Sequence, residues 1–195
     1  MPYRFKFYVG DQVQFQCDIE SQRCISNNKN GLRCNRKVCI GTKYCWTHLL
    51  YLKHLKIKNS TLPDAGKGLF AMNPALEANA LIFRRGDLII DYQGEFINDA
   101  ELEDRYGEYT GTYAARLKRN VVEDCACERG VGSIANQANR ANGNNAILRA
   151  NYQVHPQRIQ LKASRDIRNN LEIFVDYGDE YQLDEDTHST TLPIK

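Results

Sequence analysis

Short alternating runs of hydrophobic and polar residues dominate the chain after residue 58. Alternation with a period of two is typical of half-buried strands, and these runs are too short for most helices. An Arg85-Gly86-Asp87 turn divides the first long run into two strands, and each remaining run is expected to form one or two strands. The sequence therefore predicts strands within residues 69–71, 81–97, 112–126, 158–167 and 172–181.

Two segments have the pattern of a helix. Residues 49–58 predict a short amphipathic helix with its leucines on one side, and residues 98–109 predict an acidic helix capped by Asn98 or Asp99. Residues 130–153 are rich in Asn, Gly and Ala, which favour turns. The fold class is therefore mostly β with short helices, which argues against a doubly wound nucleotide-binding fold.

The composition is that of a globular chain of one domain with a small appendage. Of the 195 residues, 42% are hydrophobic and 26% are charged. No apolar run approaches the roughly 20 residues that cross a bilayer, and the first residues lack the apolar stretch of a secretory signal. We therefore expect an intracellular protein without a membrane partner. Its seven cysteines are then expected to be metal ligands or thiols rather than disulfides, with Cys125 and Cys127 as buried thiols.

Positive charge is concentrated in the first part of the chain. Residues 1–58 contain 11 Lys and Arg against 3 Asp and Glu, whereas residues 59–195 contain 15 against 21. A basic region on an acidic body favours two surfaces with different partners. The basic side chains could bind nucleic-acid phosphates, or they could form a solvated positive face. They are Arg33, Arg36, Lys37, Lys43, Lys53, Lys56 and Lys58.

Five of the seven cysteines lie between Cys17 and Cys45, and His48 follows closely. Three thiolates and one imidazole form the donor set of a structural zinc site, and this polar segment has little else to fold around. Cys39 could replace one ligand and Cys17 could serve a second site, or these cysteines could be buried thiols. Residues 24–48 also resemble short Cys-Cys-Cys-His modules that end in Tyr-Cys-Trp-x-His. The predicted zinc ligands are Cys24, Cys34, Cys45 and His48.

Five motifs of the body occur in the order found in one enzyme family. GKGLFA resembles that family's first cofactor loop, GDLIIDYQGEFI its strand pair ending in Tyr-x-Gly-Glu, and VGSIANQAN its Gly-x-x-Asn-His-Ser segment. GNNAIL resembles the Pro-Asn-Ala strand, and EIFVDYGDEY resembles the closing Glu-Leu-x-x-Asp-Tyr-Gly motif. The chain thus resembles SET-domain protein lysine methyltransferases over roughly residues 60–181, preceded by the Cys-Cys-Cys-His module.

The resemblance implies a SET-domain fold, which is a mostly antiparallel β-clip whose C-terminal segments pass through a loop as a pseudoknot. The expected domains are a basic region with the zinc module over 1–58, the SET domain over 59–181, and a C-terminal tail over 182–195. No cysteine follows Cys127, so the zinc-bound cap found after the SET domain in many members is absent. The tail, which we expect to be irregular, or a partner chain would then close the lysine channel.

The resemblance also implies the transfer of a methyl group from S-adenosylmethionine to a lysine amine. This reaction is mainly a positioning problem, and it needs a neutral amine although the ordinary pKa of lysine is about 10.4. Tyr177 is the expected catalytic residue, and Tyr92 is expected to pack beneath the site. The expected channel wall is Tyr113, Phe174 and Tyr181, with core packing as the alternative for the first two.

Two loops supply the residues expected to bind the cofactor, which are Gly66, Lys67, Gly68, Leu69, Asn136 and Gln137. Gln137 stands where the family has His, and Ala138-Asn139 stands where it has Ser-Cys. Asn136 could instead, or in addition, be a buried residue that bridges loops. The residue two before Tyr177, which is often aromatic in the family and is linked to methyl number, is Val175.

The expected substrate is a basic protein, for example a histone, which would give the protein a nuclear, chromatin-associated role. Acidic residues of the 98–109 helix could attract it, or they could form a solvated helix face; they are Asp99, Glu101, Glu103, Asp104 and Glu108.

Two other functions compete with methyl transfer. The body could be a non-catalytic binding module, which the changes at residues 137–139 would favour, or the basic zinc region could bind nucleic acid. The sequence leaves the oligomeric state open.

Overall fold

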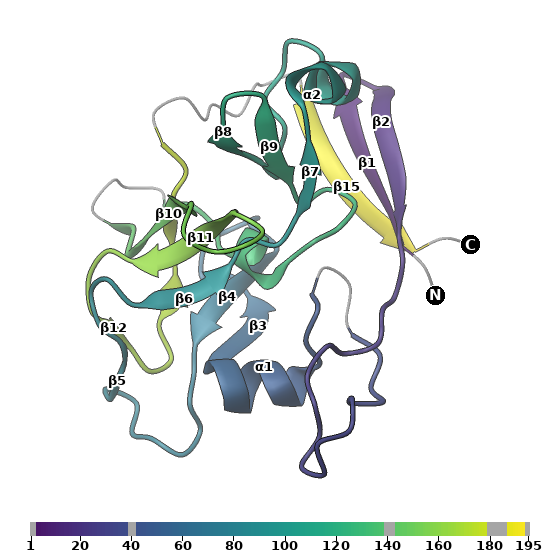
Figure 1. Ribbon diagram of the computed structural model, residues 1–195. Coiled ribbons are helices and arrows are strands. Elements are labelled where there is room, and N and C mark those ends of the chain that lie inside the picture. The colour runs from purple at the N-terminus through teal and green to yellow at the C-terminus, as the bar shows by residue number, and fades with distance from the viewer. Residues whose placement is uncertain (1–2, 39–41, 139–142, 179–186, 194–195) are drawn as a thin grey trace.

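The computed structural model describes residues 3–38, 42–138, 143–178 and 187–193 (Figure 1). Strands make up most of its regular structure, together with two short α-helices and one 3-10 helix, as the sequence pattern predicts. None of the helices in these four segments is long and apolar enough to span a membrane. The helices are α1 (Trp46–Lys53), α2 (Asp99–Tyr106) and η1 (Val131–Ile134). The strands are β1 (Tyr3–Val9), β2 (Gln12–Ile19), β3 (Leu55–Asn59), β4 (Lys67–Ala71), β5 (Leu81–Phe83), β6 (Leu88–Asp91), β7 (Glu95–Ile97), β8 (Ala114–Lys118), β9 (Val121–Asp124), β10 (Ala146–Asn151), β11 (Arg158–Ala163), β12 (Ile167–Arg168), β13 (Glu172–Ile173), β14 (Val175–Asp176) and β15 (Thr187–Pro193).

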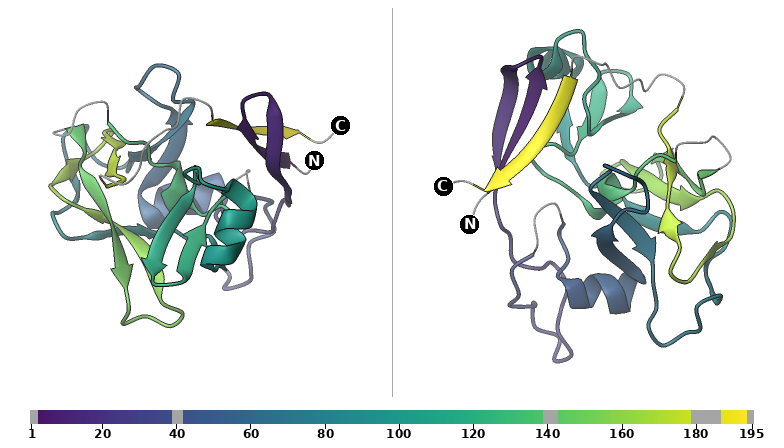
Figure 2. Two further views of the ribbon diagram at one scale, coloured as in Figure 1. Left: turned by 90° about the horizontal axis from the view of Figure 1, so that it is seen from above. Right: turned by 180° about the vertical axis from the view of Figure 1, so that it is seen from behind.

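The first and last strands share one sheet, which we call the N-terminal sheet. Its order is β15-β1-β2, all antiparallel, and Tyr3 lies opposite Pro193. Figure 2 shows this sheet beside the rest of the molecule, with both ends of the chain at the same place. The prediction of an irregular tail is therefore wrong for residues 187–193, which form a strand by pairing with β1 along their whole length.

Aromatic packing holds the N-terminal sheet against α2. Phe5 and Phe7 are fully buried, and the Phe7 ring meets the Tyr106 ring edge to face with centroids 5.0 Å apart. Burying a phenylalanine side chain contributes roughly 1.5–3 kcal/mol. The hairpin of β1 and β2 thus packs against α2 in one hydrophobic cluster. The cysteine-rich segment that follows it forms a separate cluster.

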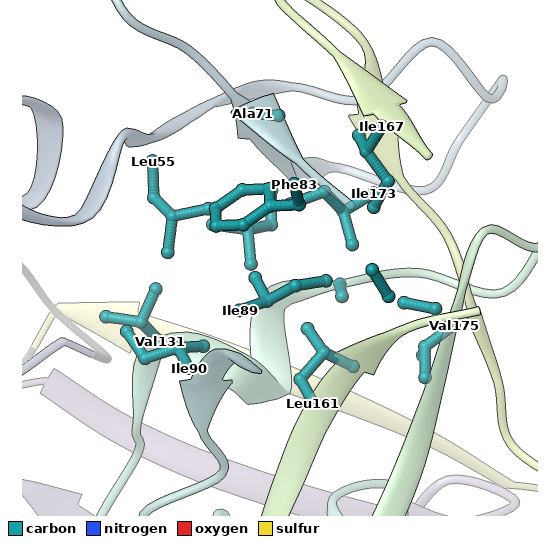
Figure 3. Packing of buried hydrophobic residues seen from close by; sticks show 14 of the residues in the cluster. Leu55, Ala71, Phe83, Ile89, Ile90, Val131, Leu161, Ile167, Ile173 and Val175 are labelled. Atoms are coloured by element: carbon teal, nitrogen blue, oxygen red, sulfur yellow. The ribbon is translucent and has the colours of Figure 1, made fainter. Parts of the chain in front are cut away.

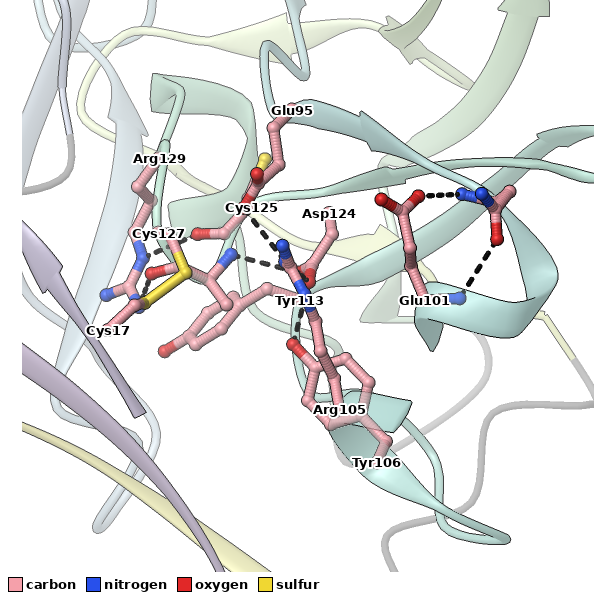
Figure 4. Close-up of polar contacts among 12 residues, drawn as sticks. Cys17, Glu95, Glu101, Arg105, Tyr106, Tyr113, Asp124, Cys125, Cys127 and Arg129 are labelled. Atoms are coloured by element: carbon pink, nitrogen blue, oxygen red, sulfur yellow. Dashed lines mark hydrogen bonds and ion pairs between the residues drawn. A yellow bond between two sulfur atoms is a disulfide. The ribbon is translucent and has the colours of Figure 1, made fainter. Parts of the chain in front are cut away.

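A disulfide joins Cys17 of β2 to Cys127, which is 110 residues further along the chain. Figure 4 shows this bond beside Arg129, between the N-terminal sheet and the segment after β9. The prediction of thiols is therefore wrong for Cys127, and Cys17 cannot serve a second metal site. Cys125 is the buried thiol that the sequence predicts, and burial raises its pKa, so it remains protonated.

We expect the Cys17→Ser variant to unfold more easily than the wild type. A cross-link that closes a loop of this length restricts the unfolded chain, and its loss typically costs about 2–4 kcal/mol of unfolding free energy. Urea denaturation of both proteins measures this difference. A reductant that leaves zinc in place should lower the stability of the wild type only, because the variant has no such bond to lose. Alkylation of Cys17 or Cys127 in the unreduced wild type would contradict the cross-link.

The main hydrophobic core lies between three sheets of the body, whose strand orders are β14-β10-β11-β6, β13-β4-β3 and β12-β5. Figure 3 shows aliphatic side chains from all three sheets meeting there, together with Val131 of η1. Leu161, Ile167 and Ile173 are among those that are fully buried. Each comes from a different sheet, so the core fixes the three sheets relative to one another.

The segment from Glu172 to Tyr177 passes between parts of the chain that are distant in sequence. β13 pairs with β4 on one side, β14 pairs in parallel with β10 on the other, and Phe174 bridges to Asn136 between them. The buried side chain of Asn145 accepts a hydrogen bond from the Phe174 N–H and donates one to the Glu172 carbonyl, both at 2.9 Å. This threading is the pseudoknotted arrangement that the family resemblance predicts, and it brings residues of β4, 135–137 and β14 together.

One of the two predicted helices is correct and the other ends early. In α2, Asn98 accepts from the Glu101 N–H and the Glu101 side chain accepts from the Asn98 N–H, which is a complete capping box. By contrast, the prediction that a helix continues to residue 58 is wrong. His54 ends α1 in a left-handed conformation with φ 53°, and Leu55 begins β3 because it alternates into the core and pairs with β4.

Candidate active site and metal centre

Cys24, Cys34, Cys45 and His48 lie together at the start of α1, as the sequence predicts for the ligands of one metal ion. Cys45 is the N-cap residue of this helix, so His48 in the first turn comes back to within 3.2 Å of the Cys45 sulfur through Nδ1. The same nitrogen is 3.4 Å from the Cys24 sulfur, and the Cys34 and Cys45 sulfurs are 4.0 Å apart. All four donor atoms lie within 4.8 Å of one another.

These separations fit a tetrahedral zinc ion. Zinc–sulfur bonds of about 2.3 Å and zinc–nitrogen bonds of about 2.0 Å place neighbouring donors between roughly 3 and 4 Å apart. The three cysteines are buried, and no other group of at least three possible ligands occurs in the described residues. Cys39, the alternative ligand, lies outside them.

Exposed arginines of the cysteine-rich segment form hydrogen bonds to its own main chain. The Arg23 guanidinium donates to the Cys34 carbonyl at 2.7 Å, and the Arg33 guanidinium donates to the Cys24 carbonyl at 3.1 Å. Arg36 donates to the Thr47 hydroxyl, and Lys43 forms an ion pair with Glu128 of the body. Three of the basic groups considered for phosphate binding, Arg33, Arg36 and Lys43, thus have partners within the protein, although the two arginines remain exposed.

A second set of candidate residues surrounds the start of β4. Gly66 has φ +66°, and no described atom lies within 4 Å of the position that a Cβ would occupy, so its main chain faces open space. Lys67 is exposed and donates to the Asn59 side chain at 2.6 Å. Leu69, by contrast, is fully buried in the main core, so its side chain cannot contact a cofactor as predicted.

The buried carboxylate of Glu172 organises this region, and the sequence analysis did not single it out. Its Oε1 accepts from the Ser60 hydroxyl at 2.7 Å, and its Oε2 accepts from the Thr61 N–H and hydroxyl at 2.6 Å. A Cβ on Gly68 would lie 2.0 Å from Oε1, so the second glycine of GKG exists to make room for this carboxylate. The available signal was its place as the first residue of the closing Glu-Leu-x-x-Asp-Tyr-Gly motif, directly before the apolar residues 173–175.

Asn136 and Gln137 connect the predicted cofactor loop to the segment that carries Tyr177. The Asn136 side chain donates to the Lys67 carbonyl at 3.0 Å and to Glu172 Oε1 at 3.4 Å, so it bridges loops as one of the two interpretations predicts. The exposed Gln137 accepts from the Tyr177 N–H through Oε1 at 3.2 Å. The predicted cofactor and catalytic residues other than Leu69 therefore form one continuous set.

Tyr177 lies where this set meets a cleft of about 410 Å³. Its hydroxyl donates to the Ala135 carbonyl at 2.8 Å, which fixes the ring at the cleft. The opposite walls come from β8 with the loop before it and from β10 and β11. Apolar side chains form much of the lining, among them Leu102, Val122, Leu148, Ala150 and Ile159.

The other predicted channel residues have different outcomes. Tyr113 does not line the cleft; its ring packs 5.8 Å from Phe5 and under the Arg129 guanidinium at 4.0 Å, so packing, the alternative interpretation, accounts for it. Phe174 contributes its main chain to the threaded segment and is half-buried. Tyr181 lies outside the described residues. Tyr92, expected only to pack, lines the cleft and donates through its hydroxyl to the Tyr113 carbonyl at 3.1 Å.

A buried ionic network fixes the α2 wall of the cleft (Figure 4). Arg105 donates to Glu95 and to Asp124, both at 2.8 Å, and the Tyr106 hydroxyl donates to Asp124 at 2.9 Å. Burial, and then the Asp124 charge, raise the pKa of Tyr106, so its hydroxyl remains a donor. Since these contacts join α2 to β7 and β9, they also hold Leu102 of α2 at the cleft.

Comparison with known proteins gives solved structures of the same fold. A chain of the polycomb repressive complex 2 of Chaetomium thermophilum matches with a TM-score of 0.53 and 25% identity over 65% of this chain. A structure of that complex in an autoinhibited conformation bound to S-adenosylmethionine matches with a TM-score of 0.51 and 26% identity over 65%. A third, with H3K27me3 and H3K27M, matches with a TM-score of 0.52 and 25% identity over 68%.

The relationship concerns a small part of those larger proteins, because the chain spans only 15% of the length of each of them. No curated protein sequence matches the chain significantly. The SET domain family matches residues 66–178, which is more than half of the chain and includes the cofactor loop, the cleft and Tyr177. The chain therefore belongs to the SET-domain family.

Proposed function

We propose that this protein transfers a methyl group from S-adenosylmethionine to a lysine of a basic protein, with a histone as the first candidate. One observation carries the proposal: Tyr177 lines a cleft that has both apolar and polar walls, while its main-chain N–H is bound to Gln137 beside the predicted cofactor contact Asn136. Support also comes from the solved relatives, one of which binds S-adenosylmethionine and another of which contains H3K27me3. A histone substrate would place the protein at chromatin.

Residues of three segments would hold the cofactor, which supplies a methyl group on a positively charged sulfur. The open main chain at Gly66 allows close approach, and Asn136 fixes the Lys67 carbonyl beside it. The segment up to Gln137 lies against the strand that carries Tyr177. The predicted cofactor residues and the catalytic tyrosine are therefore close enough to act on one ligand.

Tyr177 would orient the lysine amine. A phenolic oxygen that donates its hydrogen to a carbonyl can accept a hydrogen bond from an amine at the same time. Apolar residues such as Leu148 and Ile159 disfavour an ammonium ion, so the amine would enter the reaction neutral. The new carbon–nitrogen bond forms as the carbon–sulfur bond breaks, and the extra proton on nitrogen leaves to solvent.

The substrate peptide would extend along β8. The sheet order β7-β9-β8 leaves one edge of β8 unpaired among the described strands, and residues of that strand line the cleft. Such an edge binds extended peptides through main-chain hydrogen bonds. The exposed acidic residues Glu103 and Asp104 of α2, and Glu108 just after it, lie next along the chain to cleft residues and would attract a basic peptide.

The decisive experiment combines a calorimetric titration with S-adenosylmethionine and a methyl-transfer assay on core histones, read by mass spectrometry. We expect saturable binding and methylated lysine, both absent from reactions without protein. If folded, zinc-loaded protein bound no S-adenosylmethionine and methylated no histone, the non-catalytic binding module would replace this proposal. Binding without transfer to histones would overturn the histone assignment alone.

We also infer that Cys24, Cys34, Cys45 and His48 hold a structural zinc ion. The inference rests on their donor set and separations, and on the small core of this segment, which among its described residues consists of the three cysteines and Val38. Such a site supplies folding free energy and no open coordination position, so it takes no part in methyl transfer.

A further inference from the structure

Residues 135–137 each accept one hydrogen bond from the end of β14 or from Tyr177, which follows it. The Ala135 carbonyl accepts from the Tyr177 hydroxyl, the Asn136 carbonyl accepts from the Val175 N–H at 2.8 Å, and the Gln137 side chain accepts from the Tyr177 N–H. The first two bonds use main-chain acceptors, which any residue supplies. The third is made by a side chain, so it depends on which residue occupies position 137.

The bond from the Tyr177 N–H to the Gln137 side chain lies beyond the last pair of the β-sheet ladder. β14 ends at Asp176, and its ladder to β10 pairs only Val175 and Asp176. Tyr177 is one residue beyond that ladder, and Gly178 follows with φ +89°, so the chain turns away at once. The Gln137 bond therefore holds the main chain of Tyr177 at a point where the ladder to β10 gives no support.

We propose that Gln137 is a positioning residue for Tyr177, and not primarily a contact of the cofactor. Its amide oxygen fixes the Tyr177 main chain and, through it, the place of the hydroxyl in the cleft. This inference rests on the proposed methyl transfer. It assigns a role to the glutamine that stands where the family pattern has histidine.

The two roles of Gln137 predict different kinetics. Loss of a cofactor contact raises the Kd for S-adenosylmethionine, whereas misplacement of the Tyr177 hydroxyl lowers kcat. We expect Gln137→Ala to lower kcat by about tenfold or more, while the Kd for S-adenosylmethionine changes by less than about threefold. Gln137→Glu retains an acceptor oxygen and should restore most of kcat. Gln14→Ala, an exposed glutamine of the N-terminal sheet, is the matched control and should behave as the wild type.

A histidine variant adds a sharper test. In Gln137→His, a neutral ring nitrogen can accept from the Tyr177 N–H, but an imidazolium cannot. Its kcat should therefore fall below a pH of about 6.5 relative to the wild type. The nearby Asp176 carboxylate, which accepts from the Gly178 N–H at 3.0 Å, is present in both proteins, which differ only at position 137. A constant ratio from pH 5.5 to 8 would overturn the proposal.

Amide hydrogen exchange separates this inference from the proposed function. The Tyr177 N–H should exchange slowly in the wild type and faster in Gln137→Ala, whether or not a substrate has been found, provided that both proteins have the same melting temperature. Unchanged exchange would overturn the positioning role. Faster exchange in a protein without any methyl transfer would support the hydrogen bond and overturn the proposed function instead. A raised Kd for S-adenosylmethionine with unchanged kcat would instead indicate that Gln137 contacts the cofactor.

Discussion

Replacing Tyr177 by phenylalanine should abolish most methyl transfer while leaving the fold and cofactor binding intact. The change removes one hydroxyl at the end of the cleft, where we propose that it orients the lysine amine. Loss of one positioned hydrogen-bonding group at a reacting centre typically lowers kcat by about 10²–10³-fold. Single-turnover methylation of the best histone substrate, with the Kd for S-adenosylmethionine measured in parallel, checks the prediction.

Tyr152→Phe provides the matched control for this experiment. The Tyr152 hydroxyl also donates to a main-chain carbonyl, that of Leu117 at 2.8 Å, but it does not line the cleft. Each substitution leaves one carbonyl without its donor, at a cost of roughly 1–3 kcal/mol where that carbonyl is buried. Both variants should therefore lose some stability, and only Tyr177→Phe should lose its activity. Equal activity of the two variants would show that the Tyr177 hydroxyl is not needed for catalysis.

Removal of zinc should unfold the cysteine-rich segment and lower the melting temperature of the whole protein. Binding free energies of about 10–16 kcal/mol are typical of structural zinc in small modules, and without them such modules do not fold. The effect should reach the body, because Cys45 and His48 begin α1 and the next residue, Leu49, is buried in the main core. Treatment with a chelator, followed by circular dichroism and a thermal scan, measures it.

Variants of single cysteines decide which ones bind the metal. The purified protein should contain one zinc ion per chain, and Cys45→Ser should contain none. Cys125→Ala removes a cysteine that is equally buried but remote from the cluster, so it should keep its zinc even if its stability falls. Loss of zinc from Cys39→Ser would contradict the ligand set inferred from the geometry.

Local chemistry explains which features could be predicted from the sequence. The cap of α2 depends on four consecutive residues, from Asn98 to Glu101, and most strands of the body follow from alternation over a few positions, although β3 and β10 were not predicted in this way. The four predicted zinc ligands come together because they lie in one short segment with spacings suited to a single ion. The ordered motifs of the body, taken together, predicted the family to which the chain belongs.

The features that sequence analysis missed depend on distant contacts. Nothing near Cys17 indicates that it bonds to Cys127, since the partners are 110 residues apart. β15 forms because β1 is available as a partner, and Glu172 becomes an organising group only when Ser60 and Thr61 fold onto it. The sequence also left Tyr113 open between channel and core packing, because its contact with Phe5 joins residues that are distant in the chain.

The pairing of β1 with β15 has a consequence for how the protein is made. β1 is synthesised well before β15, so their pairing closes a long loop, and such contacts form slowly. The segment that carries Tyr177 is also synthesised after β4 and β10, the strands with which it pairs. The hairpin of β1 and β2 must therefore keep one edge open until β15 has been synthesised.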